Sequence, residues 1–187
     1  MAAVASIDAR EILALAPTVP DLWGDLRSDH AGEVGAVMIY RGILAGSRDG
    51  DVRRFAAEHM TTEIEHRELM EDLVPAAQRS RLLPAWKIAG WLTGFLPALI
   101  GPTAVYATIE AVETFVDRHY DEQIRKLAPT GAAGALRAIL CGCRQDELHH
   151  RDEARAAQFK PAGRVLALWA AMVGFGSRAA VVAARRI

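Results

Sequence analysis

One glutamate followed by a glutamate–histidine pair is a pattern that this chain contains twice. In the first copy, Glu63 comes thirty residues after Glu33, and His66 follows three positions later. Because residues three positions apart share one face of a helix, such a pair can direct both side chains at one metal ion. The second copy has nearly the same spacing. It consists of Glu113, Glu147 and His150.

Four carboxylates and two imidazoles inside a helical bundle are the ligand set of ferritin-like dimetal proteins. Buried carboxylates repel one another and lose hydration unless cations neutralise them, and two divalent ions would do so. Carboxylate and imidazole ligands suit iron or manganese. The spacing therefore predicts a dimetal site. The alternative is a solvated helix face with incidental histidines, and spacing alone leaves Glu110 as a rival to Glu113.

Two further residues could orient the histidines of this site. A metal-bound histidine usually donates its second N–H to a neighbouring oxygen. Asp146 precedes Glu147, and Thr62 occupies the matching position before Glu63. We expect Asp146 to hold His66 and Thr62 to hold His150.

Helices must position these residues, because helical periodicity dominates the chain and no alternating strand pattern is visible. The expected helices cover 23–45, 52–77, 85–100, 103–127, 132–158 and 165–185, with a turn and an N-cap within 46–51. A helix–turn–helix return brings each single glutamate level with its pair. With 187 residues, about half of them apolar, the chain suits one core. We predict an all-α, ferritin-like four-helix bundle with additional amphipathic or apolar helices, a single domain over 1–187, with 1–20 poorly ordered.

The segment 85–100 carries its large apolar side chains on one continuous helical face, with small residues opposite. Pro97 argues against a straight membrane span, so we predict a helix that lies in the membrane interface. The alternative is a helix packed on the bundle. The C-terminal helix 165–185 is long enough to span a membrane, but Arg178 within it argues against a span. The apolar face consists of Ile88, Trp91, Leu92, Phe95, Leu96, Leu99 and Ile100.

Charge and cysteine content exclude several other classes. A net charge of −1 gives no reason to expect nucleic acid as a partner. Cys141 and Cys143 have no partner cysteines for a zinc or iron–sulfur site, so both are expected to be buried thiols in a reducing compartment. Charged residues within Met1 to Pro20 argue against a cleaved signal peptide.

Several strings along the chain resemble the demethoxyubiquinone hydroxylases. The most specific is Asp29-His30-Ala31-Gly32-Glu33-Val34-Gly35-Ala36, which is similar to the opening motif of that family. The resemblance runs from about Leu26 to the C-terminus, although the loop before 132–158 is two residues shorter than in the family. The other matching strings are Glu63-x-x-His66, Leu83-Pro84-Ala85-Trp86, Ala111-Val112-Glu113, His119-Tyr120, Gln123-Ile124-Arg125 and Asp146-Glu147-Leu148-His149-His150.

The resemblance implies a di-iron monooxygenase of ubiquinone biosynthesis. It would use O2 to hydroxylate the ring of a demethoxyubiquinol, 2-polyprenyl-3-methyl-6-methoxy-1,4-benzoquinol. Two iron ions per chain would be held by the four glutamates and two histidines, with Glu113 rather than Glu110 as a ligand. His119 and Tyr120 match family positions, and Tyr120 could relay electrons or contact the quinone, unless it is simply a core tyrosine.

The resemblance also implies partners and a location. Reducing equivalents would come from NADH without a Rossmann unit, since no G-x-G-x-x-G string is present. The expected partners are the polyprenyl quinol, the membrane surface, a ubiquinone-biosynthesis complex and a lipid-presenting protein. We expect a peripheral protein on the cytoplasmic face of the cell membrane. The rival interpretations are a quinol oxidase, a ferroxidase and a metal-free, membrane-bound helical scaffold.

Overall fold

The structure is a computed structural model that describes residues 7–158 and 163–187. Over these residues it is helical and contains no strand, which confirms the all-α prediction. All six expected helices are present, with small differences at their ends. The elements are α1 (Ala9–Leu15), α2 (Leu22–Gly46), α3 (Gly50–Leu73), the short 3-10 helix η1 (Ala76–Gln78), α4 (Leu83–Ile100), α5 (Pro102–Ile124), α6 (Gly131–Ala156) and α7 (Arg164–Arg186).

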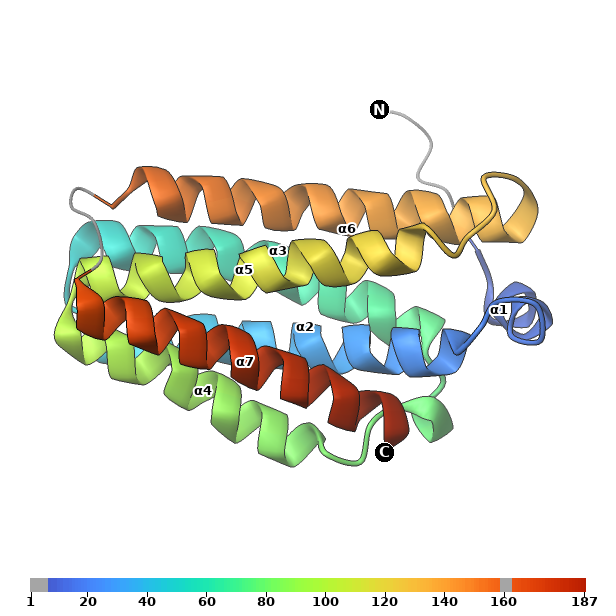
Figure 1. The fold of residues 1–187 in the computed structure, drawn as a ribbon, viewed down its shortest axis with the longest axis horizontal. Helices are drawn as coiled ribbons and strands as arrows, with labels where there is room; N and C mark the ends of the chain where they lie inside the picture. Colours follow the sequence, from blue (N-terminus) through green and yellow to red (C-terminus); the bar gives the residue numbers. More distant parts are fainter. Residues whose placement is uncertain (1–6, 159–162) are drawn as a thin grey trace.

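The helices α2, α3, α5 and α6 form a four-helix bundle (Figure 1). Two helical hairpins, α2–α3 and α5–α6, make it up, and α4 is the long crossover that connects them. Because α4 returns along the bundle, α5 runs in the same direction as α3 (Figure 1). This connectivity is the ferritin-like one that the sequence predicted.

Two apolar clusters fill the bundle, one toward each end. The first contains Leu26, Met70 and Leu136, and the second contains Ile43 and Ile109. Each bundle helix contributes residues to both clusters. The middle of every bundle helix therefore lies between two packed apolar regions, and the repeated glutamates occur there.

Local sequence signals account for the helix junctions. Asp49 caps α3, since its side chain accepts hydrogen bonds from the N–H groups of Asp51 and Val52. Between α4 and α5, Gly101 has φ 134°, a conformation that favours glycine, and Pro102 begins the next helix. These caps fix where the bundle helices start, and thus the level of their glutamates.

Helix α4 packs on α2 through its small residues. A Cβ atom at Gly94 would overlap the carbonyl oxygen of Ile39, so the two backbones are in direct contact there. The opposite face of α4 is exposed, with Leu99 61% and Ile100 72% accessible. The helix therefore packs on the bundle, as the alternative prediction had it, and exposes large apolar side chains on its other face. The membrane-interface location of this helix stays a prediction.

Helix α7 packs against α5 and α2 beside α4 and also exposes large apolar side chains, among them Val165, Leu168 and Phe175. In length and composition both α4 and α7 could cross a membrane.

Two expectations were wrong in part. Residues 1–20 were expected to be poorly ordered, yet 9–15 form α1, and Ile12 is fully buried in the first apolar cluster. A capping box between Asp8 and Glu11 stabilises this helix; residues 1–6 lie outside the described part of the chain. Cys143 is buried as expected, but Cys141 is exposed, because residues two positions apart point to different faces of α6.

Candidate metal centre

The six predicted ligand residues converge in the middle of the bundle, and all six are buried. They form two groups, and in each group the possible ligand atoms lie within 4.8 Å of one another. Glu63 and Glu147, the glutamates of the two E-x-x-H pairs, belong to both groups, so they can face two ions at once. The groups are Glu33, Glu63, His66 and Glu147, and Glu63, Glu113, Glu147 and His150.

Both histidines direct the same ring nitrogen at the carboxylates. His66 Nδ1 lies 3.1 Å from Glu147 Oε1, and His150 Nδ1 lies 3.1 Å from Glu63 Oε1. On its other side, His66 Nε2 lies 3.1 Å from Asp146 Oδ2, which is the contact expected from the sequence. No hydrogen bond joins Thr62 to His150 within the described residues.

His150 instead packs against a ring that sequence reasoning missed. The ring of His59 lies over it, with the ring centroids 4.1 Å apart. His59 comes one helical turn before Glu63 on α3, so its place on the inward face of that helix was a signal that could have identified it.

The electrostatics of the cluster show that it needs positive charge. Burial and the charge of Glu147 raise the pKa of Glu33 to about 7. Burial and the same charge place the pKa values of Glu63 and Glu113 well above the usual range. Burial also opposes the charge of Glu147, but hydrogen bonds from His150 and His66 outweigh it and lower its pKa to about 2.

The donor set therefore fits divalent metal ions. Glu63 is fully buried, yet among the described residues neither of its carboxylate oxygens accepts a hydrogen bond of proper geometry, even though His150 Nδ1 lies 3.1 Å from Oε1. Unpartnered buried carboxylate oxygens are strongly unfavourable unless a cation neutralises them. With their pKa values raised, the carboxyl groups of the metal-free cluster are neutralised by protons, and metal ions displace such protons on binding.

Glu110, the rival ligand, lies outside the cluster. Its Oε2 accepts a hydrogen bond of 2.7 Å from Gln158, and its Oε1 lies 3.5 Å from Arg155 Nε. Glu113, one turn later on α5, is 2% exposed and belongs to the second group. The geometry favours Glu113 as the metal ligand of this helix.

A hydrogen-bonded network joins the first group to α5. The Tyr120 hydroxyl donates to Glu33 Oε1 at 2.5 Å, so this tyrosine contacts a predicted ligand. His119 Nε2 lies 3.0 Å from Asp29 Oδ1, which also accepts a hydrogen bond of 2.6 Å from Gln123. Sequence reasoning gave no role to Asp29 and Gln123. Each lies one turn from a residue that it did single out, and that spacing could have revealed them.

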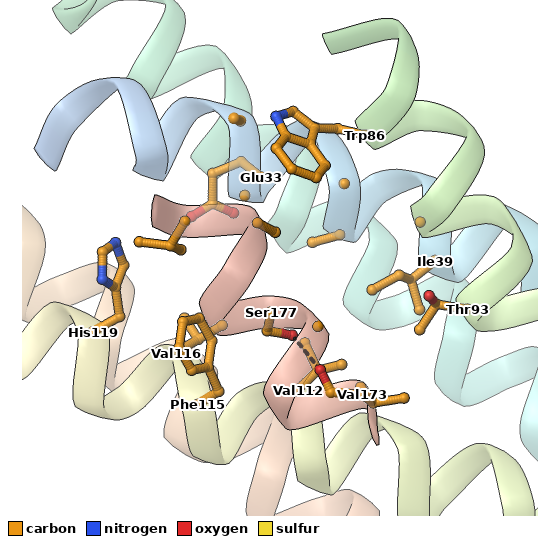
Figure 2. Close-up of a pocket in the computed structure, with 18 of the residues that line it drawn as sticks. Glu33, Ile39, Trp86, Thr93, Val112, Phe115, Val116, His119, Val173 and Ser177 are labelled. Carbon is orange, nitrogen blue, oxygen red and sulfur yellow. Dashed lines mark hydrogen bonds between the residues drawn. The ribbon is translucent and has the colours of Figure 1, made fainter. Parts of the chain in front are cut away.

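An apolar cavity of about 400 Å3 adjoins the carboxylates. Its lining includes Glu33 from α2, Trp86 from α4, and Phe115 and His119 from α5, while α7 crosses it with Val173 (Figure 2). The indole N–H of Trp86 is buried and donates to none of the residues that the structure describes. The cavity therefore connects the predicted metal ligands with the two helices that expose apolar faces.

Comparisons with known proteins agree with this geometry. Residues 22–184 match the family model described as ubiquinone biosynthesis protein COQ7. The chain is 38% identical over 148 residues to the 3-demethoxyubiquinol 3-hydroxylase of Rhodospirillum rubrum. The matched region covers 75% of this chain and 68% of that protein.

A second relative is the mitochondrial NADPH-dependent 3-demethoxyubiquinone 3-hydroxylase of Dictyostelium discoideum, 36% identical over 131 residues. That match covers 67% of this chain, which spans 59% of the length of the relative. A family match over most of the helices, including every buried glutamate and histidine of the cluster, leads to one conclusion. This chain belongs to the COQ7 family of ubiquinone biosynthesis proteins.

Proposed function

We propose that this chain is a di-iron 3-demethoxyubiquinol 3-hydroxylase, which adds one oxygen atom from O2 to the ring of a polyprenyl quinol. One observation carries the proposal: an apolar cavity of about 400 Å3 is lined at once by Glu33, Glu113 and Glu147 and by the two apolar helices α4 and α7. An aromatic ring in this cavity would lie against the metal ligands, and its tail could leave between helices that face lipid.

The metal ions would be iron, held by the two groups of buried residues. Glu33 and His66 would serve one ion, Glu113 and His150 the other, and Glu63 and Glu147 would serve both. Bound iron would supply the activation of O2 and the electron transfer that ring hydroxylation requires. The protein contributes a buried, carboxylate-rich position for the ions and an apolar space for the ring.

Three side chains are placed to handle the substrate. The free indole N–H of Trp86 can donate a hydrogen bond to a ring oxygen, which would orient the quinol. His119, which also lines the cavity, can accept a proton from a quinol hydroxyl, while Asp29 Oδ1, 3.0 Å from its Nε2, holds the imidazole in place. Tyr120 fixes the carboxylate of Glu33 through its hydrogen bond.

The same proposal places the protein on a membrane. The exposed apolar faces of α4 and α7 would lie in the lipid interface, because a polyprenyl quinol remains in the bilayer. The cytoplasmic face of a cell membrane fits a peripheral protein of this kind. A nicotinamide nucleotide, NADH or the NADPH named for the Dictyostelium relative, would be the reductant. A ubiquinone-biosynthesis complex and a lipid-presenting protein are the proposed partners.

The test is an oxygen-labelling assay with the iron-loaded chain. A short-tailed demethoxyubiquinol is incubated with ¹⁸O2 and a reductant, and the products are analysed by mass spectrometry. We expect a quinone that carries one labelled oxygen atom. Oxidised quinone without the label would indicate a quinol oxidase. Iron oxidation without any reaction of the quinol would indicate a ferroxidase, and a chain that binds no metal would be a scaffold.

A further inference from the structure

A second cavity, of about 270 Å3, lies between α2, the end of α3 and the start of α4. These segments meet at the end of the bundle near the C-terminus in Figure 1. Unlike the apolar cavity, this one is basic, and we call it the basic cavity. Glu71 is the acidic residue in its lining. Its cationic lining residues are Arg41, Arg67, Arg79 and Lys87.

A buried histidine without partners lines the basic cavity. His30 is 1% exposed, and neither of its ring nitrogens makes a hydrogen bond to any residue within 7–158 and 163–187. The carboxylate of Glu71 is 3.9 Å from Nε2, which is beyond hydrogen-bonding distance. Since buried polar groups are nearly always hydrogen-bonded, this ring requires a partner that occupies the cavity. A neutral imidazole offers one N–H donor for it.

The arginines around His30 are suited to an anion. Arg79 donates from Nε and Nη2 to the carbonyl oxygens of Val74 and Glu71, which fixes its guanidinium at the end of α3. Within the described residues the buried Nε of Arg67 makes no hydrogen bond, although it lies 3.6 Å from Glu71 Oε1, and its Nη2 lies 3.4 Å from Glu68 Oε1. Guanidinium groups bind phosphate oxygens with two parallel hydrogen bonds, so arginines held in place favour phosphate over a simple point charge.

The start of α4 adds to this field. Leu83, its first residue, lines the basic cavity, and no side chain caps the helix there. The free N–H groups and the positive end of the helix dipole favour an anion at that position. Lys87 contributes a further positive charge one turn later.

We propose that the basic cavity binds a phosphate group, with His30 and Arg67 as donors and α4 as the supporting helix terminus. The phosphate could belong to the headgroup of an anionic lipid or to a nucleotide. His30 comes from the string that carries the family resemblance, yet the metal centre makes no use of it. It lies one turn before Glu33, and Arg67 follows His66, so a bound phosphate would rest on the turns that carry two predicted ligands. The inference does not depend on the hydroxylation proposed above.

The test is isothermal titration calorimetry of the metal-loaded full chain with three probes: inorganic phosphate, NADPH and dihexanoyl-phosphatidylglycerol. Saturable binding of at least one probe supports the proposal. Binding of NADPH alone identifies a nucleotide site, and binding of the lipid alone identifies a headgroup site. Arg67→Gln should weaken that binding about tenfold, because it removes a charge-assisted hydrogen bond.

Two further variants separate a local site from diffuse attraction. Arg54→Gln removes the same charge from an exposed position thirteen residues earlier on α3, about 20 Å along the helix, and should leave the affinity unchanged. His30→Leu removes a donor but no positive charge, and should also weaken binding. The proposal is overturned if no probe saturates at millimolar concentration, or if Arg54→Gln and Arg67→Gln reduce the affinity equally.

Discussion

The two halves of the metal centre have the same ligand types but different surroundings. In the first half, Glu33 receives a hydrogen bond from Tyr120, and His66 contacts Asp146, whose side chain is 56% exposed. In the second half, His150 is enclosed by rings: His59 at 4.1 Å and the edge of Tyr40 at 6.3 Å between centroids. The repeat therefore preserves the ligands and not the environment.

Because their surroundings differ, the two predicted ion positions are not equivalent. The first half is joined by polar contacts to the cavity wall and, through Asp146, to solvent. The second is surrounded by buried rings, and its link toward solvent runs through His59, whose Nε2 lies 2.8 Å from Oε2 of the partly exposed Glu153. Burial together with the charge of His150 lowers the pKa of His59 to about 3. Substitutions that act on one half only therefore test whether the two ion positions differ.

The largest effect is expected from Glu147→Ala, because this glutamate belongs to both halves. Its loss also leaves His66 and His150 without their shared carboxylate. We expect both metal ions to be lost and hydroxylation to fall at least about 100-fold, more than typical changes around metal ligands cause. Metal analysis of the purified variant measures this. Glu33→Ala is the control, since it should remove the ion of the first half only; two ions retained in Glu147→Ala would refute the shared role.

A pH dependence of several kcal/mol is expected for the metal-free chain, and two groups of the first half contribute to it. Glu33, with a pKa of about 7 when folded and 4.5 otherwise, keeps its proton in the folded state across that interval. The free energy of unfolding therefore falls as the pH rises from 4.5 to 7, by roughly 3 kcal/mol from this group. The raised values of Glu63 and Glu113 act in the same direction.

His66 extends this trend to higher pH. Burial lowers its pKa, but the hydrogen bond to Glu147 and the charge of Glu33 outweigh that and raise it from 6.5 to about 10. Its stabilisation is complete below pH 6.5 and is lost as the pH rises through 10. Chemical denaturation at pH 5, 7 and 9, with and without metal, measures both contributions. Glu33→Gln should reduce the fall in stability over the lower interval, while the contributions of Glu63 and Glu113 remain; metal-free protein that becomes more stable between pH 5 and 9 would contradict the assignment.

Asp146→Asn should weaken metal binding in the first half by about 10- to 100-fold, the range typical of residues that hold a metal-bound histidine. The asparagine keeps the size of the side chain but removes the charge that faces His66 Nε2. Competition with a chelator, followed for each equivalent of metal, gives the two affinities. Asp152→Asn, another exposed aspartate on α6, is the matched control. Equal weakening of both equivalents would show that the halves do not act separately.

Tyr120→Phe should lower the free energy of unfolding by about 1 kcal/mol, because it removes the hydrogen bond to Glu33. Tyr40→Phe is the matched change beside the second half. The Tyr40 hydroxyl is buried and has no hydrogen-bond partner in the described part of the chain, so its removal should be neutral or slightly stabilising. Thermal and denaturant unfolding of the two variants compare them directly, and equal losses would mean that the two tyrosines have similar surroundings.

The sequence predicted the bundle and the convergence of six side chains because helical periodicity and the i, i+3 rule are local. It could not predict that Thr62 lacks a bond to His150. Spacing places His59 on the inward face of α3, but only the packing of α3 against α6 brings its ring against His150. The basic cavity could not be predicted either, because it depends on how α2 packs against the end of α3 and the start of α4. Local spacing determines which residues face inward, whereas packing determines their partners.

Glu110 shows most clearly that local spacing does not determine the partners of a side chain. Its substitution is expected to have the smallest effect of those predicted. Spacing alone could not separate it from Glu113, yet its partially exposed carboxylate is paired with Gln158 and Arg155 at the surface of α5. Exposed ion pairs contribute little, so Glu110→Gln should change the free energy of unfolding by less than about 0.5 kcal/mol and leave two metal ions bound. Glu113→Gln, one turn away, should lose the ion of the second half. Metal analysis of this pair tests whether inward packing, and not sequence spacing, selects the ligand of α5.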